Sequence, residues 1–252
     1  MQKKNTCLII IIIILAILLL GLGGYLIYDK VLNNNDKANN TEVPDNSINN
    51  VKDIITNELY VLYDKNSIAE ITNQEKLKVA IRKMWKETSD PITTITADEL
   101  ENYYKKTSIG NLPIIHESIY SDIDNIPAYE FDARTNTYSS NNVVGHGGNQ
   151  IEPIYTRITD YNVDGDTYKI AVQFIFADVY FDEKIYATYN DAKNDTNEIA
   201  NIPSYNGNDH LDNLKKYAEE HYDELKDKLY TYNYTFVYEN DIFKLTDYSI
   251  EK

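Results

Sequence analysis

The side chains best suited to chemistry in this chain are oxygen ligands at alternate positions before a glycine. Asp160, Asn162 and Asp164 precede Gly165, which matches the first half of a calcium-binding loop. The twelfth position of such a loop should supply a bidentate glutamate, and here it is Ala171. Because an Asp-Gly pair also forms a plain hairpin turn, we expect a turn, and the three oxygen-bearing residues are only a weak metal candidate.

A second local feature is the run Gly145-His146-Gly147-Gly148. Its glycines permit close backbone approach, so the run could form an anion-binding nest or a pair of oxyanion donors. A serine hydrolase would also need a nucleophile elbow, and the sequence contains no G-x-S-x-G. We therefore expect a surface loop and keep His146 as a candidate ligand-surface residue.

Other catalytic and cofactor signatures are absent from the sequence. The four histidines are isolated, and there is no H-E-x-x-H, cysteine pair or phosphate-binding glycine loop. A glycosidase needs two carboxylates roughly 5 to 9.5 Å apart, but among 40 acidic residues any fold will bring some pair into range. We expect no cofactor, assign no catalytic residue and lean against an enzyme.

Tyrosine is unusually frequent, with 23 residues against 6 phenylalanines and 1 tryptophan. Tyr230, Tyr232, Tyr234, Phe236 and Tyr238 follow one another at every second position, so they share one face of a strand. Such a stripe could bind sugars, because tyrosine joins an apolar ring to a polar tip. It is more often the buried side of a sheet, so we favour a core and keep the four tyrosines as a candidate ligand surface.

Two hairpins must position these residues. A two-residue Asp164-Gly165 loop predicts a type I′ hairpin with Val163 opposite Asp166, and the apolar alternation over 168–176 predicts a central strand. A second hairpin should turn at Asn240-Asp241. Between them we expect an insertion over 182–228, loop-like at first and then helical.

The part of the chain before the hairpins reads as helical. The folded domain should begin near Val51, and a helix over about 74–87 should bury Trp85 on its apolar face. Thr96 and Glu99 form a capping box, which predicts a further helix that stops at Gly110. The stretch 110–150 gives no firm prediction.

The N-terminal region predicts a membrane anchor. Residues 7–28 are uncharged, and a helix of 22 residues spans roughly 33 Å, slightly more than a ~30 Å hydrocarbon core. Lys3 and Lys4 should hold residues 1–6 in the cytoplasm. A cleaved signal peptide is the alternative, but its apolar core is usually only about 7 to 15 residues long. We therefore expect a single-pass cell-membrane protein with a flexible, Asn-rich stalk over 29–50 and an extracytoplasmic domain over 51–252.

Charge and cysteine content exclude several functions for the outer domain. Lys3 and Lys4 are the only charges before Asp29, so the remainder has 22 basic and 40 acidic residues and a net charge of −18. That field repels nucleic acid. The only cysteine, Cys7, lies within the apolar segment, so the domain has neither a disulfide nor thiol chemistry.

Helices followed by antiparallel hairpins predict an α+β domain in which helices pack on a curved antiparallel sheet. The element order resembles the nuclear transport factor two-like and cystatin-like cone folds, and YTFVYENDIFKLTDYSI looks like their last two strands. The basic start, single span, Asn-rich stalk and acidic cysteine-free domain resemble membrane-anchored proteins of low-GC Gram-positive bacteria. The resemblance implies a pocket between sheet and helices in a binding or assembly module.

Three functions follow as hypotheses. The first is a membrane-tethered binding or scaffolding domain that contacts an envelope protein or cell-wall glycan. The second is a carbohydrate binder or an enzyme acting on envelope glycans. The third is an accessory subunit of a membrane secretion or conjugation assembly. In each case the membrane is contacted through residues 7–28 and no nucleic acid is bound.

Overall fold

The computed structural model describes residues 45–88, 92–120, 127–141, 151–179, 183–202 and 210–252. The chain divides into two units, 1–42 and 43–252, and the described residues belong to the second. The expected membrane segment 7–28 and the candidate His146 lie outside the described residues. Within the described part, no helix is both long and apolar enough to cross a membrane.

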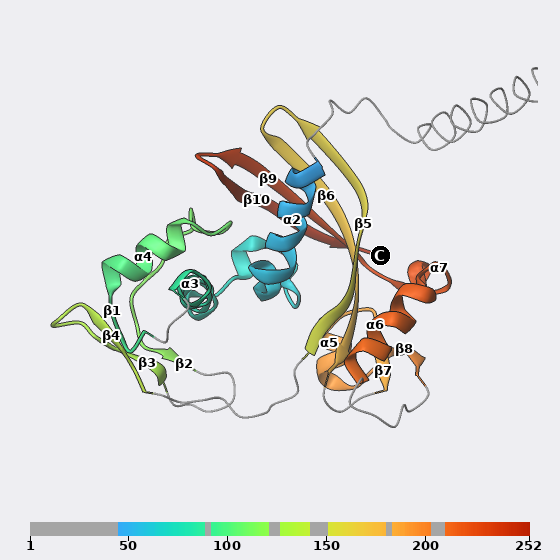
Figure 1. The fold of residues 1–252 in the computed structure, drawn as a ribbon, viewed down its shortest axis with the longest axis horizontal. Coiled ribbons are helices and arrows are strands. Elements are labelled where there is room, and N and C mark those ends of the chain that lie inside the picture. Colours follow the sequence, from blue (N-terminus) through green and yellow to red (C-terminus); the bar gives the residue numbers. More distant parts are fainter. Residues whose placement is uncertain (1–44, 89–91, 121–126, 142–150, 180–182, 203–209) are drawn as a thin grey trace, which may run out of the picture. The chain divides into compact units, whose positions relative to one another are not determined.

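A curled antiparallel sheet is built around one long strand, β6, as predicted (Figure 1). Along one edge β6 pairs with β5, and along the other it pairs with β9 and, near its end, with β7. β10 pairs with β9 and β8 pairs with β7. The strands of this sheet are β5 (Ile151–Asp164), β6 (Thr167–Asp178), β7 (Lys184–Tyr186), β8 (Glu198–Asn201), β9 (Thr231–Glu239) and β10 (Ile242–Glu251).

Both predicted hairpins form, but one turn differs from its prediction. Asn240 and Asp241 both have positive φ, 50° and 63°, as a type I′ turn requires. In the β5–β6 turn only Gly165 has positive φ, and Asp164 pairs with Thr167, so the loop is Gly165-Asp166. Glycine at the first loop position is typical of a type II′ turn. The loop therefore lies one residue later than predicted, and the partner of Val163 is Tyr168 instead of Asp166, a shift of two residues.

The main core lies between one sheet face and the N-terminal helices. Val51, Ile55 and Leu59 are fully buried against the aromatic stripes of β6 and β9. This confirms the predicted burial of the central part of the stripe. The covering elements are α2 (Asp45–Asn57), the 3₁₀ turns η1 (Leu59–Leu62) and η2 (Ile68–Glu70), and α3 (Asn73–Thr88).

The opposite face of the sheet is also covered, where one-sided coverage was expected. Ile175, Ala177 and Ile185 form a second buried cluster with Leu214 and Leu225. The supposed loop over 182–208 contains β7, β8 and a short helix, and the following helix breaks at His221. These elements are α5 (Tyr189–Asn194), α6 (His210–Glu220), α7 (Tyr222–Leu225) and the 3₁₀ turn η3 (Lys226–Lys228).

A second antiparallel sheet occupies much of the stretch that gave no firm prediction. Its strand order is β1-β4-β3-β2. The capping box is confirmed, since Thr96 Oγ1 accepts from Glu99 N at 3.2 Å, but the helix ends before Gly110. Gly110 still matters, because a Cβ there would overlap the carbonyl oxygen of Tyr104. The elements are β1 (Thr94–Thr96), α4 (Ala97–Lys105), β2 (Ile119–Tyr120), β3 (Pro127–Asp132) and β4 (Thr137–Ser140).

Two N-terminal predictions need correction. Helix α2 begins at Asp45, so the last part of the expected stalk over 29–50 is helical. Helix α3 matches its prediction, but Trp85 is 52% exposed and is not a core residue. Its indole Nε1 instead donates a hydrogen bond to the hydroxyl of Tyr129 at 3.0 Å.

Candidate functional site

An open groove of about 370 Å³ lies where the tips of the two hairpins meet α2 and the end of α3. This volume is at the lower end of the range typical of small-ligand pockets, roughly 300 to 1,000 Å³. Its lining combines aromatic rings, carboxylates, amides and two lysines. We call this feature the hairpin-tip groove.

The hairpin wall of the groove is an aromatic cluster centred on Phe243. Its ring lies 4.7 Å from that of Tyr238 and 4.9 Å from that of Tyr168, the latter edge-on. The type I′ turn brings Asp241 back beside Tyr238, whose hydroxyl donates to Asp241 Oδ1 at 3.2 Å. This hydrogen bond to Asp241 raises the pKa of the Tyr238 hydroxyl. Tyr238 is 37% exposed, and its backbone is held by a 2.8 Å bond to the carbonyl of Asp166.

One face of α2 forms the facing wall. Asn50, Asp53 and Asn57 are exposed and recur every three or four residues, so they line the same side of the helix. Val51 and Ile55 on the other side are buried in the core, which fixes the direction of the polar face. Among the described residues, no hydrogen-bond or ion-pair partner is found for the Asp53 carboxylate. That wall therefore offers one free acceptor group flanked by amides.

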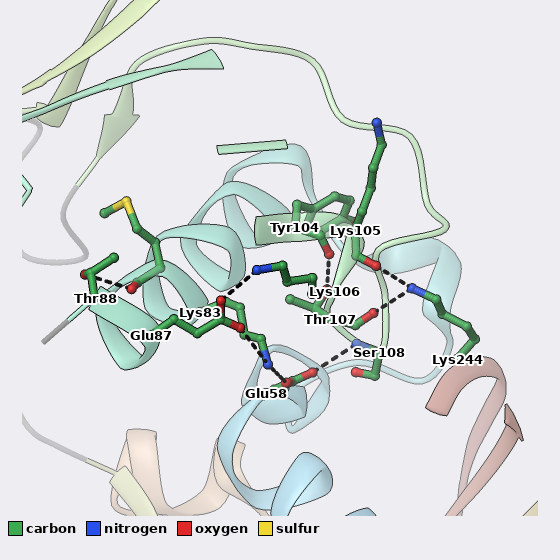
Figure 2. A network of polar contacts seen from close by, with 11 residues as sticks. Glu58, Lys83, Glu87, Thr88, Tyr104, Lys105, Lys106, Thr107, Ser108 and Lys244 are labelled. Atoms are coloured by element: carbon green, nitrogen blue, oxygen red, sulfur yellow. Dashed lines mark hydrogen bonds and ion pairs between the residues drawn. The ribbon is translucent and has the colours of Figure 1, made fainter. Parts of the chain in front are cut away.

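The end of the groove at α3 is stiffened by a polar network (Figure 2). Lys83 Nζ lies 3.6 Å from carboxylate oxygens of both Glu58 and Glu87. Glu58 also accepts a 2.9 Å hydrogen bond from the amide of Ser108. Lys106 contacts Glu87 at 2.8 Å, and this hydrogen bond is the main cause of the lowered pKa of Glu87. The network joins the turn that follows α2, helix α3 and the loop after α4.

The same loop holds β10 in place. Lys244 Nζ donates to the carbonyls of Lys105 and Thr107 at 2.6 and 3.1 Å (Figure 2). Leu245 N donates to Ser108 O at 2.8 Å. Partial burial lowers the pKa of Lys244. The loop after α4 thus contacts both walls of the groove, through Glu58 on one side and through β10 on the other. These contacts favour a binding site that is formed before the ligand arrives.

Of the candidate ligand-surface tyrosines, only Tyr238 lines the groove. Tyr232 and Tyr234 are 0% and 1% exposed, so the prediction that they form a ligand surface is wrong. Both rings pack in the main core. Tyr230 is half-buried and lies beneath the ammonium group of Lys252, 5.1 Å from its ring centre.

The weak calcium candidates lie along a strand. Asp160, Asn162 and Asp164 are exposed residues of β5, in the hairpin that the Asp-Gly pair predicted. At about 3.3 Å per residue, Asp160 and Asp164 are roughly 13 Å apart along the strand, whereas calcium ligands lie about 2.4 Å from the ion. In the described ranges, no group of three or more histidine, cysteine or acidic side chains could hold a metal.

Sequence reasoning missed most of the groove. Tyr168 and Phe243 were expected only as strand residues, and Asn50 was assigned to the stalk. Their convergence depends on the pairing of β6 with β9, which no local spacing reveals. The one usable signal was Tyr238, the last member of the aromatic stripe.

No family model, curated protein or solved structure matches the chain, so its function must be inferred from its own residues. The groove offers an aromatic face, a free carboxylate and amide groups within one concave surface. Such a surface can stack on an apolar ligand face and exchange several neutral hydrogen bonds with the ligand.

Proposed function

We propose that the protein is a membrane-tethered, extracytoplasmic binding or scaffolding domain whose ligand site is the hairpin-tip groove. The observation that carries this proposal is that the exposed Tyr238 and the free Asp53 carboxylate both line one groove of about 370 Å³. The tether rests on the sequence, in which the uncharged stretch 7–28 is long enough to span a bilayer.

The tether is tested by fractionating cells that express the full chain with a C-terminal tag. The protein should remain in the membrane fraction after an alkaline wash, and protease added to intact cells should remove the tagged domain. A mature protein in the medium that begins near Gly24 would instead identify a cleaved signal peptide.

The groove is tested with the full chain in detergent micelles and purified cell-wall material as the probe. Tyr238→Ala removes the exposed ring and should weaken binding roughly 5- to 30-fold, the effect of losing about 1 to 2 kcal/mol at a binding hot spot. Asp53→Ala should act in the same direction. Tyr120→Ala is the matched control, because Tyr120 is 43% exposed and lies outside the groove. Equal losses from Tyr238→Ala and Tyr120→Ala would rule out the groove as the ligand site.

A carbohydrate is the second candidate ligand. Sugars present apolar C–H faces ringed by hydroxyl groups, and Tyr238 lies with Asn50, Asp53 and Asn57 in one groove. A soluble β-1,4-linked N-acetylglucosamine oligomer should then displace the wall material from the protein. If protease-treated wall no longer binds and the oligomer fails to compete, the partner is a wall protein.

A further inference from the structure

Helix α3 is a positively charged element in a strongly acidic chain. It has five basic residues and two acidic ones, a net charge of 5 − 2 = +3, whereas the whole chain has a net charge of −16. Lys78, Arg82 and Lys86 recur every four residues, so they lie along one side of the helix. The Arg82 guanidinium is held 4.1 Å over the ring of Tyr60, and Lys86, which also lines the hairpin-tip groove, is exposed.

The only tryptophan of the chain lies on this side. Trp85 is 52% exposed, and the bond from its Nε1 to the Tyr129 hydroxyl fixes the direction of the indole. Three of the four large apolar side chains that are exposed in the described part lie on or beside α3. Besides Trp85 these are Ile115 and Tyr120, whose amides bond to the side chains of residues at the start of the helix. We call Lys78, Arg82, Trp85 and Lys86 the basic face.

We propose that the basic face rests on anionic phospholipid headgroups of the membrane that holds the anchor. This inference depends on the proposed function, because it takes residues 7–28 as a membrane span. Tryptophan is favoured at membrane–water interfaces, and lysine and arginine are attracted to anionic headgroups. The remainder of the chain is acidic and is repelled by the same surface, so charge selects this face.

The length of the linker supports a lipid occupant over a soluble acidic partner. Only 16 residues, 29–44, separate the expected span from α2. Their maximal reach is about 55 Å, and a flexible chain of that length has a mean span of about 22 Å. The domain would therefore stay close to the bilayer, where a high effective concentration makes even a weak attraction sufficient.

Trp85 provides a direct measurement, because it is the only tryptophan. The full chain is reconstituted into vesicles of phosphatidylcholine alone, or of phosphatidylcholine and phosphatidylglycerol in equal parts. Brominated acyl chains in either lipid quench a nearby indole. With phosphatidylglycerol we expect a blue-shifted Trp85 emission and severalfold stronger quenching. Both effects should be lost when salt is raised from about 0.1 M to about 1 M, because the Debye length then falls from about 10 to about 3 Å.

The variant that tests the charges leaves the fluorophore in place. Combining Lys78→Gln, Arg82→Gln and Lys86→Gln should reduce the phosphatidylglycerol-dependent quenching to the level seen in phosphatidylcholine alone. Circular dichroism checks that this variant is folded.

The matched control removes the same number of charges from exposed lysines of α5 and α6. Lys193→Gln, Lys215→Gln and Lys216→Gln together should keep the full quenching.

Each other outcome overturns a different statement. A chain that fails to float with either kind of vesicle contradicts the membrane tether itself. A chain that floats, but whose Trp85 emission is the same in both kinds of vesicle, contradicts the lipid contact alone. If soluble polyglutamate shifts the emission as strongly as phosphatidylglycerol does, the basic face binds an acidic polymer and the lipid proposal is wrong.

Discussion

Replacing Phe236 by alanine tests most directly whether the aromatic stripe of β9 is a core. Phe236 is 0% exposed and lies opposite Tyr168 in β6 and Leu245 in β10. Its ring centre is 6.1 Å from that of Tyr234 and 6.5 Å from that of Phe243. Truncation therefore leaves a cavity among three strands, with little freedom for the surroundings to collapse.

The expected cost of Phe236→Ala is about 3 to 5 kcal/mol, the usual range for removing a buried phenylalanine. Tyr238→Ala changes the same strand face two residues further on. Because Tyr238 is 37% exposed and mainly contacts Phe243, it should lose only about 1 kcal/mol. The two variants should thus differ at least roughly threefold in their loss of stability.

Urea unfolding of residues 43–252, followed by circular dichroism, measures both losses. The fragment corresponds to the compact unit of the chain. Unchanged slopes with shifted midpoints would show that the native state alone was perturbed. Similar losses for Phe236→Ala and Tyr238→Ala, or a loss below about 1 kcal/mol for Phe236→Ala, would refute the assignment of the stripe to the core.

Three further outcomes are expected. Tyr234→Phe removes a buried hydroxyl that has no partner among the described residues, so stability in urea should stay level or rise by about 1 kcal/mol; a clear loss would reveal a partner. The fragment 51–252 should unfold at lower urea than 43–252, because it lacks the first half of α2; equal midpoints would show that this half adds nothing. Lys106 holds the pKa of Glu87 below its ordinary 4.5 in the folded state. The Glu87–Lys106 pair therefore stabilises the folded domain above pH 4.5, and this stabilisation is lost as the pH falls through the lower, folded-state pKa of Glu87. Between about pH 5 and pH 3, Glu87→Gln should therefore lose less stability than the parent chain, and identical pH profiles would contradict this.

The hairpins could be predicted because their signals are local. Alternating apolar residues and positive-φ turn formers are short-range properties, and both hairpins form. The remaining error was the choice of turn, since Gly165 can occupy either loop position. In the structure Gly165 is the first loop residue, so the loop moves by one residue and the cross-strand partners next to it move by two. Because side chains alternate with a period of two, each residue keeps its predicted face of the sheet.

The second sheet could not be predicted in the same way. Its strands β1, β2 and β4 have only two to four residues, too few for a period to be recognised. They are held by partners far along the chain, as in the pairing of Ile95 with Tyr138. Tertiary pairing decides the conformation of such segments, and their own propensity does not.

Trp85 shows how helical spacing can mislead at the edge of a stripe. Trp85 lies four residues after the buried Ile81, the spacing that suggested a shared helix face. It also lies only one residue after Met84, which is fully buried near the middle of the apolar stripe. One residue corresponds to about 100° of rotation, so Trp85 falls beside the buried stripe and remains 52% exposed. The groove was similarly hidden, because Asp53, Lys83 and Tyr238 come from three distant segments.

The position of β9 between β6 and β10 also dictates when the domain can become stable during its synthesis. Strand β9 contributes Tyr232, Tyr234 and Phe236 to the main core, and it leaves the ribosome after α2, α3 and β6, which pack in the same core. Until then, β6 has no strand paired along its β9 edge, and the main core lacks the side chains of β9. The nascent domain must therefore remain open, with apolar surface exposed, until β9 has emerged. A premature stop before β9 would consequently yield an unfolded chain for quality-control proteases rather than a shortened working domain.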